Sequence, residues 1–395
     1  MPRNAPWNSI LVMPDDLIAF AWSAPMRDLA AQLGMSDVGL KKLLASYGIA
    51  PPPQGYWNKV RAGKPVPPRP RHPPRRPGES GRFSVDRRFA NVIPSAEPMP
   101  STGPFTTAAV PEDLEELRAQ ELKAIGRVRV PRSLDRPHSG LIALLRKEKQ
   151  RRDKNAGRDW QLDPPKFDGP LDQRKLRLTN AILLALAGRG HTGNVSEASS
   201  QIHGRAIVGG TYLGLRFEVV GRHRTIVQDH YKRPAPDLPA STPLALWIDP
   251  GFDARRSKSW EDDEDGKLET KVGAIAAGII VAGEAQFRRS LRDREARLEQ
   301  ERLEQERRRQ ARLDEMNRQR VADLLASGDL LRRSQEIRAV VQRVRAALLD
   351  SGQVDAATFR VWEQWALAEA DKLDPILSGQ VQTHLHAPTL DEGSS

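Results

Sequence analysis

A run of charged residues from Glu284 to Arg320 constrains this chain more than any other feature of its sequence. Arg, Glu and Gln make up most of the run, so it carries too few apolar side chains to be packed into a core. Pairs of opposite charge four residues apart favour a long helix: Asp293 with Arg297, and Glu304 with Arg308. Leu291 and Leu298 fit a heptad repeat, but the later apolar residues do not continue it. We therefore expect a long solvated helix rather than a dimeric coiled coil.

Changes in composition divide the 395 residues into five regions. Residues 63–110 are rich in Pro, Arg, Ser and Gly, which is typical of an extended linker or arm with polyproline character. The expected regions are a helix-turn-helix-like module at 1–62, the Pro/Arg-rich linker or arm at 63–110, an α+β domain at 111–283, the charged helix with a helical hairpin at 284–375, and a flexible tail at 376–395.

The region 111–283 has the pattern of a small antiparallel sheet covered by helices. Helices are expected from Pro111, over Leu171–Gly190 and over Lys267–Ala285. Four β-like segments lie between the last two: Arg205–Val208, Thr211–Val220, Arg224–Gln228 and Leu244–Ile248. Farther along, Asp329–Leu349 and Asp355–Leu373 are expected to form an antiparallel hairpin. The fold class expected for the whole chain is therefore mixed and mainly α.

The first 62 residues predict three short helices, over Pro14–Trp22, over Pro25–Leu33 and from Ser36 onward. Ser36 is a good N-cap, and Gly48 is a good stop. The inner face of the third helix is expected to hold Val38, Leu40, Leu43, Leu44 and Tyr47. Two helices joined by a tight turn that contains Gly34 are typical of a helix-turn-helix, whose second helix lies in the DNA major groove.

A reading helix of this kind presents its exposed N-terminal residues to base edges. The candidates are Ser36, Asp37, Gly39, Lys41 and Lys42. Lysines contact guanine edges or phosphates, whereas Asp37 accepts from cytosine but repels phosphate. A three-helix packing unit that docks a protein, or has no ligand, remains the alternative.

The sequence that follows, PPPQGYWNKVRAGK, suggests a rigid strut that leads into a basic arm. Residues 51–90 carry ten Lys or Arg against two acids. Tyr56 and Trp57 are candidates for stacking on a base or sugar, and folding back onto the helices is the alternative. Lys59, Arg61 and Lys64 are candidates for phosphate contacts, which give affinity that falls steeply with salt.

The segment WSAPMRDLAAQLGMSDVGLKK…GIAPPPQGYWNK resembles the start of a widespread group of uncharacterised bacterial proteins. The pattern of that group runs W-S-x-P-M, L-A, G-x-S-D-V-x-L, then G-I-P-x-P-P-x-G-Y-W-x-K. The matching residues are Trp22, Ser23, Pro25, Met26, Leu29, Ala30, Gly34, Ser36, Asp37, Val38, Leu40, Gly48, Ile49, Gly55, Tyr56, Trp57 and Lys59. Ala50 departs from the usual proline and Gln54 from the usual basic residue. The resemblance implies a helix-turn-helix and brings no established activity.

Charge and cysteine usage limit the functional classes. The net charge of +11 favours a polyanionic partner, and nucleic acid is the commonest one. The absence of cysteine excludes disulfides and thiolate chemistry, which fits a cytoplasmic protein. The longest apolar run, Val272–Ala282, is too short to span a membrane, so no membrane partner is expected.

Two further patterns bear on enzymatic activity. The eight histidines are scattered. Five of them show no metal-ligand spacing and are expected at the surface or in loops: His138, His191, His203, His223 and His230. The acidic residues of WEDDEDGK, from Trp260 to Lys267, are more typical of a solvated loop than of converging metal ligands. We expect no cofactor, no metal and no catalytic residue.

These patterns together predict a DNA-binding protein, with residues 284–375 available for self-association or a protein partner. The alternative, from another class, is an interaction scaffold whose N-terminal module docks protein. A metal-dependent nuclease is the weaker alternative.

Overall fold

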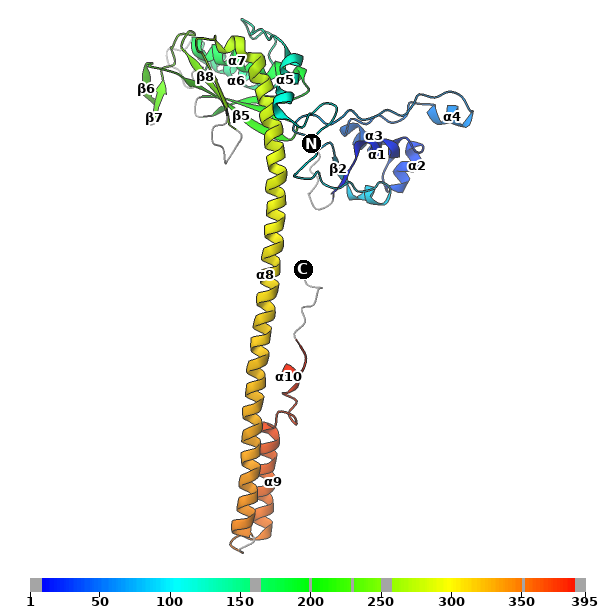
Figure 1. The fold of residues 1–395 in the computed structure, drawn as a ribbon, viewed down its shortest axis with the longest axis vertical. Coiled ribbons are helices and arrows are strands. Elements are labelled where there is room, and N and C mark those ends of the chain that lie inside the picture. The colour runs from blue at the N-terminus through cyan, green and yellow to red at the C-terminus, as the bar shows by residue number, and fades with distance from the viewer. Residues whose placement is uncertain are drawn as a thin grey trace. The chain divides into compact units, whose positions relative to one another are not determined.

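A computed structural model describes residues 9–156, 165–198, 201–228, 231–249, 258–349 and 352–387 (Figure 1). The fold is mainly helical, with a small antiparallel sheet and a long C-terminal helix, as expected. The chain divides into two compact units, residues 1–294 and residues 295–395. Within the described residues, no helix has both the length and the apolar character that crossing a membrane requires.

The N-terminal part of the first unit is a small helical module. Its elements are β1 (Ser9–Val12), α1 (Pro14–Ala21), α2 (Met26–Gln32), α3 (Asp37–Ser46), α4 (Tyr56–Arg61), β2 (Phe83–Asp86) and the 3-10 turn η2 (Arg87–Asn91). Pro14 begins α1, where its missing N–H costs no hydrogen bond. Ser36 caps α3 as expected, and Gly48, with φ of +73°, follows its end.

The segment expected as a linker over 63–110 contributes to this module. Strand β2 pairs antiparallel with β1, from Ser9 opposite Asp86 to Val12 opposite Phe83. Val85 and Phe89 are buried in the same cluster as Leu17 and Leu40. The apolar segment at residues 83–93 is short and directly follows a long Pro/Arg-rich run. The composition of the whole region therefore did not reveal it. The expected boundary at residue 62 is therefore wrong, because the module's core extends to Ile93.

The second part of the first unit is the α+β domain. Its helices are α5 (Leu114–Ile125), α6 (Ser139–Asn155), α7 (Pro170–Gly188) and the beginning of α8 (Leu268–Val344). Its main sheet is antiparallel, in the order β3 (Thr192–Ala198), β4 (Gln201–Val208), β5 (Thr211–Val219), β8 (Leu244–Asp249) and β9 (Lys258–Glu261). A separate hairpin is formed by β6 (Thr225–Gln228) and β7 (Tyr231–Pro234).

The core of this domain lies between one face of the sheet and residues of three helices, α6, α7 and α8. Leu213 of β5 and Leu246 of β8 share a buried cluster with Ile182 of α7 and Ile275 of α8. On β5, buried residues alternate with Tyr212 and Arg216 on the opposite face, which matches the strand pattern in the sequence.

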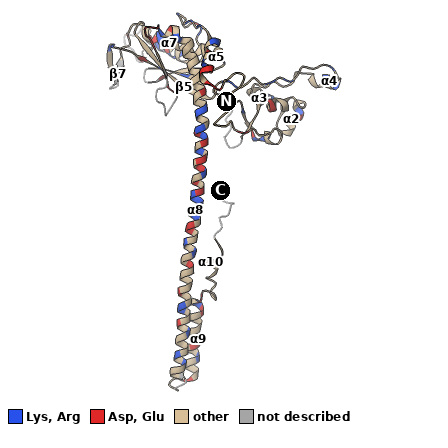
Figure 2. Cartoon of the chain, in the orientation of Figure 1, with Lys and Arg blue, Asp and Glu red and all other residues tan. Residues whose placement is uncertain are grey.

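Helix α8 is continuous where the sequence suggested separate segments. The expected helices at 267–285, 284–320 and 329–349 join into one helix of 77 residues. The residues at the expected breaks include no proline, and a single glycine, Gly328, costs a helix only about 1 kcal/mol. Figure 2 shows acidic and basic residues interspersed along the exposed part of this helix.

The second unit contains the helical hairpin. The last turns of α8 run through the π-helical turn η3 (Arg345–Leu349) and return as α9 (Ala356–Leu373), which Asp355 caps. Ser334 Oγ donates to the carbonyl of Ala370 (2.8 Å), and Arg345, farther along the chain, pairs with Glu363, which comes earlier on α9. The two helices are therefore antiparallel, as expected.

The described part of the expected tail is structured. Helix α10 (Gln382–Leu385) brings His384 Nε2 within 3.0 Å of Ser327 Oγ, and Arg320 donates to the carbonyl of His384 (2.7 Å). A flexible tail over all of 376–395 is therefore wrong for residues 376–387, because partners on α8 hold this segment. Residues 388–395 lie outside the described residues.

Candidate nucleic-acid interface

The packing of helix α3 defines which of its side chains face outward. Leu40 and Leu44 are fully buried in the cluster that contains α1 and α2. Residues three and four apart share a helix face. The opposite face carries Val38, Lys41, Lys42 and Ala45, all exposed.

Val38 lies on the outer face of α3, whereas the sequence predicted it in the core. Its side chain is 55% exposed, because two residues turn a helix by about 200° and Leu40 is fully buried. The exposed face of α3 therefore carries an apolar group, Val38, beside Lys41 and Lys42.

Two of the residues predicted to contact base edges, Ser36 and Gly39, form the N-terminal cap of α3. The Gly39 N–H donates to Ser36 Oγ (3.1 Å), which is the capping bond of α3. A Cβ at Gly39 would lie 3.1 Å from the same oxygen, so a larger residue there would crowd the cap. Asp37, Lys41 and Lys42 remain as predicted residues whose side chains are exposed.

The predicted basic residues share one electrostatic property. Lys41, Lys42, Lys59, Arg61 and Lys64 are exposed, and none of the ion pairs between described residues involves them. Elsewhere on the surface, Arg88 pairs with Asp86 and Arg302 with Glu299. The positive charge of α3, of α4 and of the residues after α4 therefore has no carboxylate partner within the described chain.

The two predicted aromatic residues have different surroundings. Tyr56, at the start of α4, stacks edge to face on Trp22 with ring centroids 5.2 Å apart, and Trp57 contacts Tyr56 in the same way. Trp22 Nε1 in turn donates to the carbonyl of Ala50 (3.0 Å). Tyr56 thus folds back onto the helical module, and Tyr56 and Trp57 are both half-buried.

The basic arm after α4 is attached at two places. The His72 N–H donates to Asp15 Oδ1 of α1 (3.1 Å), and the His72 ring packs on Phe83. Three residues later the chain reaches the α+β domain through Arg75. The exposed residues Lys64, Arg69 and Arg71 lie before these anchors, so the arm is a tethered segment and not a free tail.

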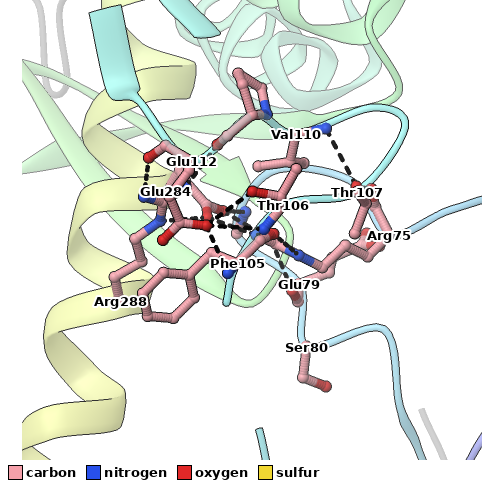
Figure 3. Close-up of polar contacts among 12 residues, drawn as sticks. Arg75, Glu79, Ser80, Phe105, Thr106, Thr107, Val110, Glu112, Glu284 and Arg288 are labelled. Carbon is pink, nitrogen blue, oxygen red and sulfur yellow. Dashed lines mark hydrogen bonds and ion pairs between the residues drawn. The ribbon is translucent and has the colours of Figure 1, made fainter. Parts of the chain in front are cut away.

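The anchor at Arg75 is a buried cluster of charges, shown in Figure 3. The Arg75 guanidinium donates to both carboxylate oxygens of Glu284 (3.1 and 2.9 Å) and to the carbonyl of Phe105. Glu284 also accepts from the Gly78 N–H (2.8 Å) and from Arg288 Nε (2.8 Å). The carboxylate has no exposed surface, and its hydrogen bonds compensate for its burial.

The protonation of Glu284 follows from this geometry. Burial alone would raise its pKa, but hydrogen bonds from Arg75, Arg288 and a backbone N–H outweigh burial. The pKa of Glu284 is therefore lowered, and the group is ionised at neutral pH.

Gly78 permits the close approach of this segment to the sheet. Its φ is +78°, and a Cβ there would lie 2.2 Å from the carbonyl oxygen of Val208. The Gly210 N–H donates to the carbonyl of Gly78 (3.0 Å). Only glycine combines a positive φ with the absence of a Cβ, so the sequence PGES, which contains Gly78, is the docking element of the arm.

The acidic segment Trp260–Lys267 is not simply a solvated loop. Both oxygens of Asp262 accept from Arg174 (2.8 and 3.0 Å), and Oδ1 accepts from the Leu268 N–H (2.8 Å) at the start of α8. Asp263 pairs with Lys271. Within the described ranges, no group of three or more His, Cys, Asp and Glu residues is arranged to hold a metal ion.

The sequence patterns misassigned Val38 and Arg75: Val38 was predicted in the core, and Arg75 was predicted to contact phosphates with the rest of the basic arm. The helical period could have assigned Val38 to the outer face, because Lys41 and Lys42 follow it by three and four residues. Arg75 had no local signal, since its partner Glu284 is 209 positions away.

Comparisons of the chain with protein-family models, with curated proteins and with solved structures found no match.

Proposed function

We propose that this protein binds double-stranded DNA through the outer face of α3, with α4 and the tethered arm adding phosphate contacts. In this proposal α2 and α3 act as a helix-turn-helix, and Lys41 and Lys42 lie at the groove with Val38 between them. The observation that carries the proposal is the set of exposed lysines and arginines of α3, α4 and the arm that pair with no carboxylate of the described chain.

Physical chemistry favours a polyanion for such a surface. Cations without internal partners are available to displace counterions from phosphates, and each phosphate contact makes binding more salt-dependent. Asp37 at the start of α3 disfavours phosphate at that point, which favours a base-edge position for this end of the helix.

The test is fluorescence anisotropy of the full chain with labelled duplexes of random sequence over a salt series. For the wild type we expect log Kd to rise linearly with log salt, with a slope of roughly 0.9 per phosphate contacted. Lys41→Ala/Lys42→Ala should weaken binding at low salt and reduce this slope by about 1 to 2.

A matched control removes the same charge from another exposed helical surface. Arg307 and Arg308 of α8 are exposed, so Arg307→Ala/Arg308→Ala changes the net charge equally. If both double variants lose the same affinity, binding reflects net charge and the assignment to α3 is wrong. If the wild type does not bind even at low salt, a protein-docking module becomes the better interpretation.

A further inference from the structure

The helical hairpin of the second unit leaves an apolar groove on one side. The groove has a volume of about 490 Å³ and lies between the last turns of α8 and α9. Its apolar lining includes Ile337, Val340, Trp362, Trp365, Ala366 and Leu373. Trp365 is 61% exposed, whereas Val341, Phe359, Ala366 and Ala370 form the small buried contact between the two helices. The hairpin therefore leaves two large apolar side chains of the groove, Val340 and Trp365, more than half exposed.

The spacing of the lining residues indicates what fits the groove. On α8 the lining residues Arg333, Ile337 and Val340 follow one another at intervals of four and three. On α9 intervals of three and four separate the lining residues Trp362, Trp365 and Glu369. Alternating steps of three and four are the pattern by which helices pack in left-handed bundles, so the groove is suited to helices.

The described tail of this chain is not the occupant. It follows a different stripe of α8, formed by Arg320 and Ser327, which continues through Ser334 at intervals of seven. That stripe faces α9 and α10, and the groove stripe lies beside it.

We propose that the groove is filled by the same hairpin of a second copy of this chain, which gives a four-helix bundle with a two-fold axis parallel to the helices. The charges at one end of the groove support self-pairing. Arg333 lies on α8 and Glu369 on α9, both lining the groove. A two-fold axis along the hairpin places α8 of one copy against α9 of the other, so Arg333 faces the opposite charge of the second copy.

The first experiment is sedimentation velocity of the full chain over a concentration series. The wild type should reach twice the 44.0 kDa mass of one chain. Trp365→Glu should shift it to the monomer, because a charge would be buried at the centre of the interface. Leu303→Glu is the control, since Leu303 is 50% exposed on α8 and does not line the groove. It should leave the dimer unchanged.

A charge exchange tests the interface and does not depend on Trp365. Arg333→Glu and Glu369→Arg should each weaken the dimer, because each places like charges opposite one another. An equimolar mixture of the two single variants should form dimers again, since opposite charges then meet in a heterodimer. A contact within one chain cannot produce that recovery.

Two results would overturn the proposal. One is a wild type that remains monomeric up to about 100 μM, a range that covers moderate self-association; the groove would then belong to a different protein. The other is a dimer that persists in Trp365→Glu and shows no recovery on mixing. Neither result bears on DNA binding by α3.

Discussion

At the scale of single residues, burial determines the protonation of a histidine in a way that the sequence does not reveal. We expected His138 and His191 at the surface or in loops, and both lie outside helices and strands but are buried. His191 follows α7 and is only 3% exposed. Burial, together with Arg76 and Arg189 and against the effect of Glu121, lowers the pKa of His191 to about 4.

The lowered pKa of His191 predicts a loss of stability in weak acid. Above the unfolded pKa of about 6.5 the group is neutral in both states and has no effect. Between about 6.5 and 4 the unfolded chain binds a proton that the folded chain does not, so the free energy of unfolding should fall as pH falls, by about 3 kcal/mol in total. Urea unfolding at several pH values measures this, and His191→Gln should flatten the curve in that window. An NMR titration of His191 with a midpoint near 6.5 would contradict the prediction.

Asp37 provides a second test of the proposed interface, in which a substitution should increase duplex affinity where the lysine substitutions decrease it. Asp37→Asn removes a negative charge beside Lys41, so duplex affinity at low salt should increase by roughly two- to fivefold, about 0.5–1 kcal/mol. The same change should slightly lower the melting temperature, because an acid at a helix N-terminus is stabilising by about 0.3–1 kcal/mol. Anisotropy and thermal unfolding of one variant measure both effects. Reduced affinity would indicate that Asp37 accepts from a base.

At the scale of elements, the sequence predicted the features that depend on residues close together in the chain. The cap at Ser36, the alternation on β5 and the hairpin of α8 with α9 were all readable, because each depends on neighbours within a few residues or on a clear period. The docking of the arm was not readable, since its partners come from the β4–β5 turn and from α8. Composition suggested an extended linker there, whereas one buried glutamate and one glycine hold the segment.

The buried cluster of Arg75, Glu284 and Arg288 predicts a loss of stability in the Glu284→Gln variant. The substitution keeps the shape but leaves Arg75 and Arg288 without a counter-charge, which should cost about 3–5 kcal/mol. In the wild type the pKa of Glu284 is lowered, so its contribution is present above the unfolded pKa of about 4.3 and disappears as pH falls through the folded pKa. Chemical unfolding at pH 7 and pH 3 measures both. The difference between variant and wild type should shrink at pH 3, and an equal difference at both pH values would refute this explanation.

At the scale of the whole molecule, the two compact units predict two unfolding transitions. Gly78→Ala should lower the transition of the first unit, because the new Cβ collides with the carbonyl of Val208. It should leave the transition of residues 295–395 in place. Trp365→Glu should do the reverse if the second unit is stabilised by a second copy. Differential scanning calorimetry of the full-length variants tests this, and a single transition that moves with both substitutions would show that the units unfold together.

The salt link between Arg75 and Glu284 also has a consequence for synthesis of the chain. The core of the N-terminal module ends at Ile93, so the module is complete early, whereas Glu284 is translated much later. At about 5–20 residues per second, the ribosome needs roughly ten to forty seconds between these two points. A nascent chain therefore carries a finished module whose basic arm is held at His72 and still unattached at Arg75 for many seconds.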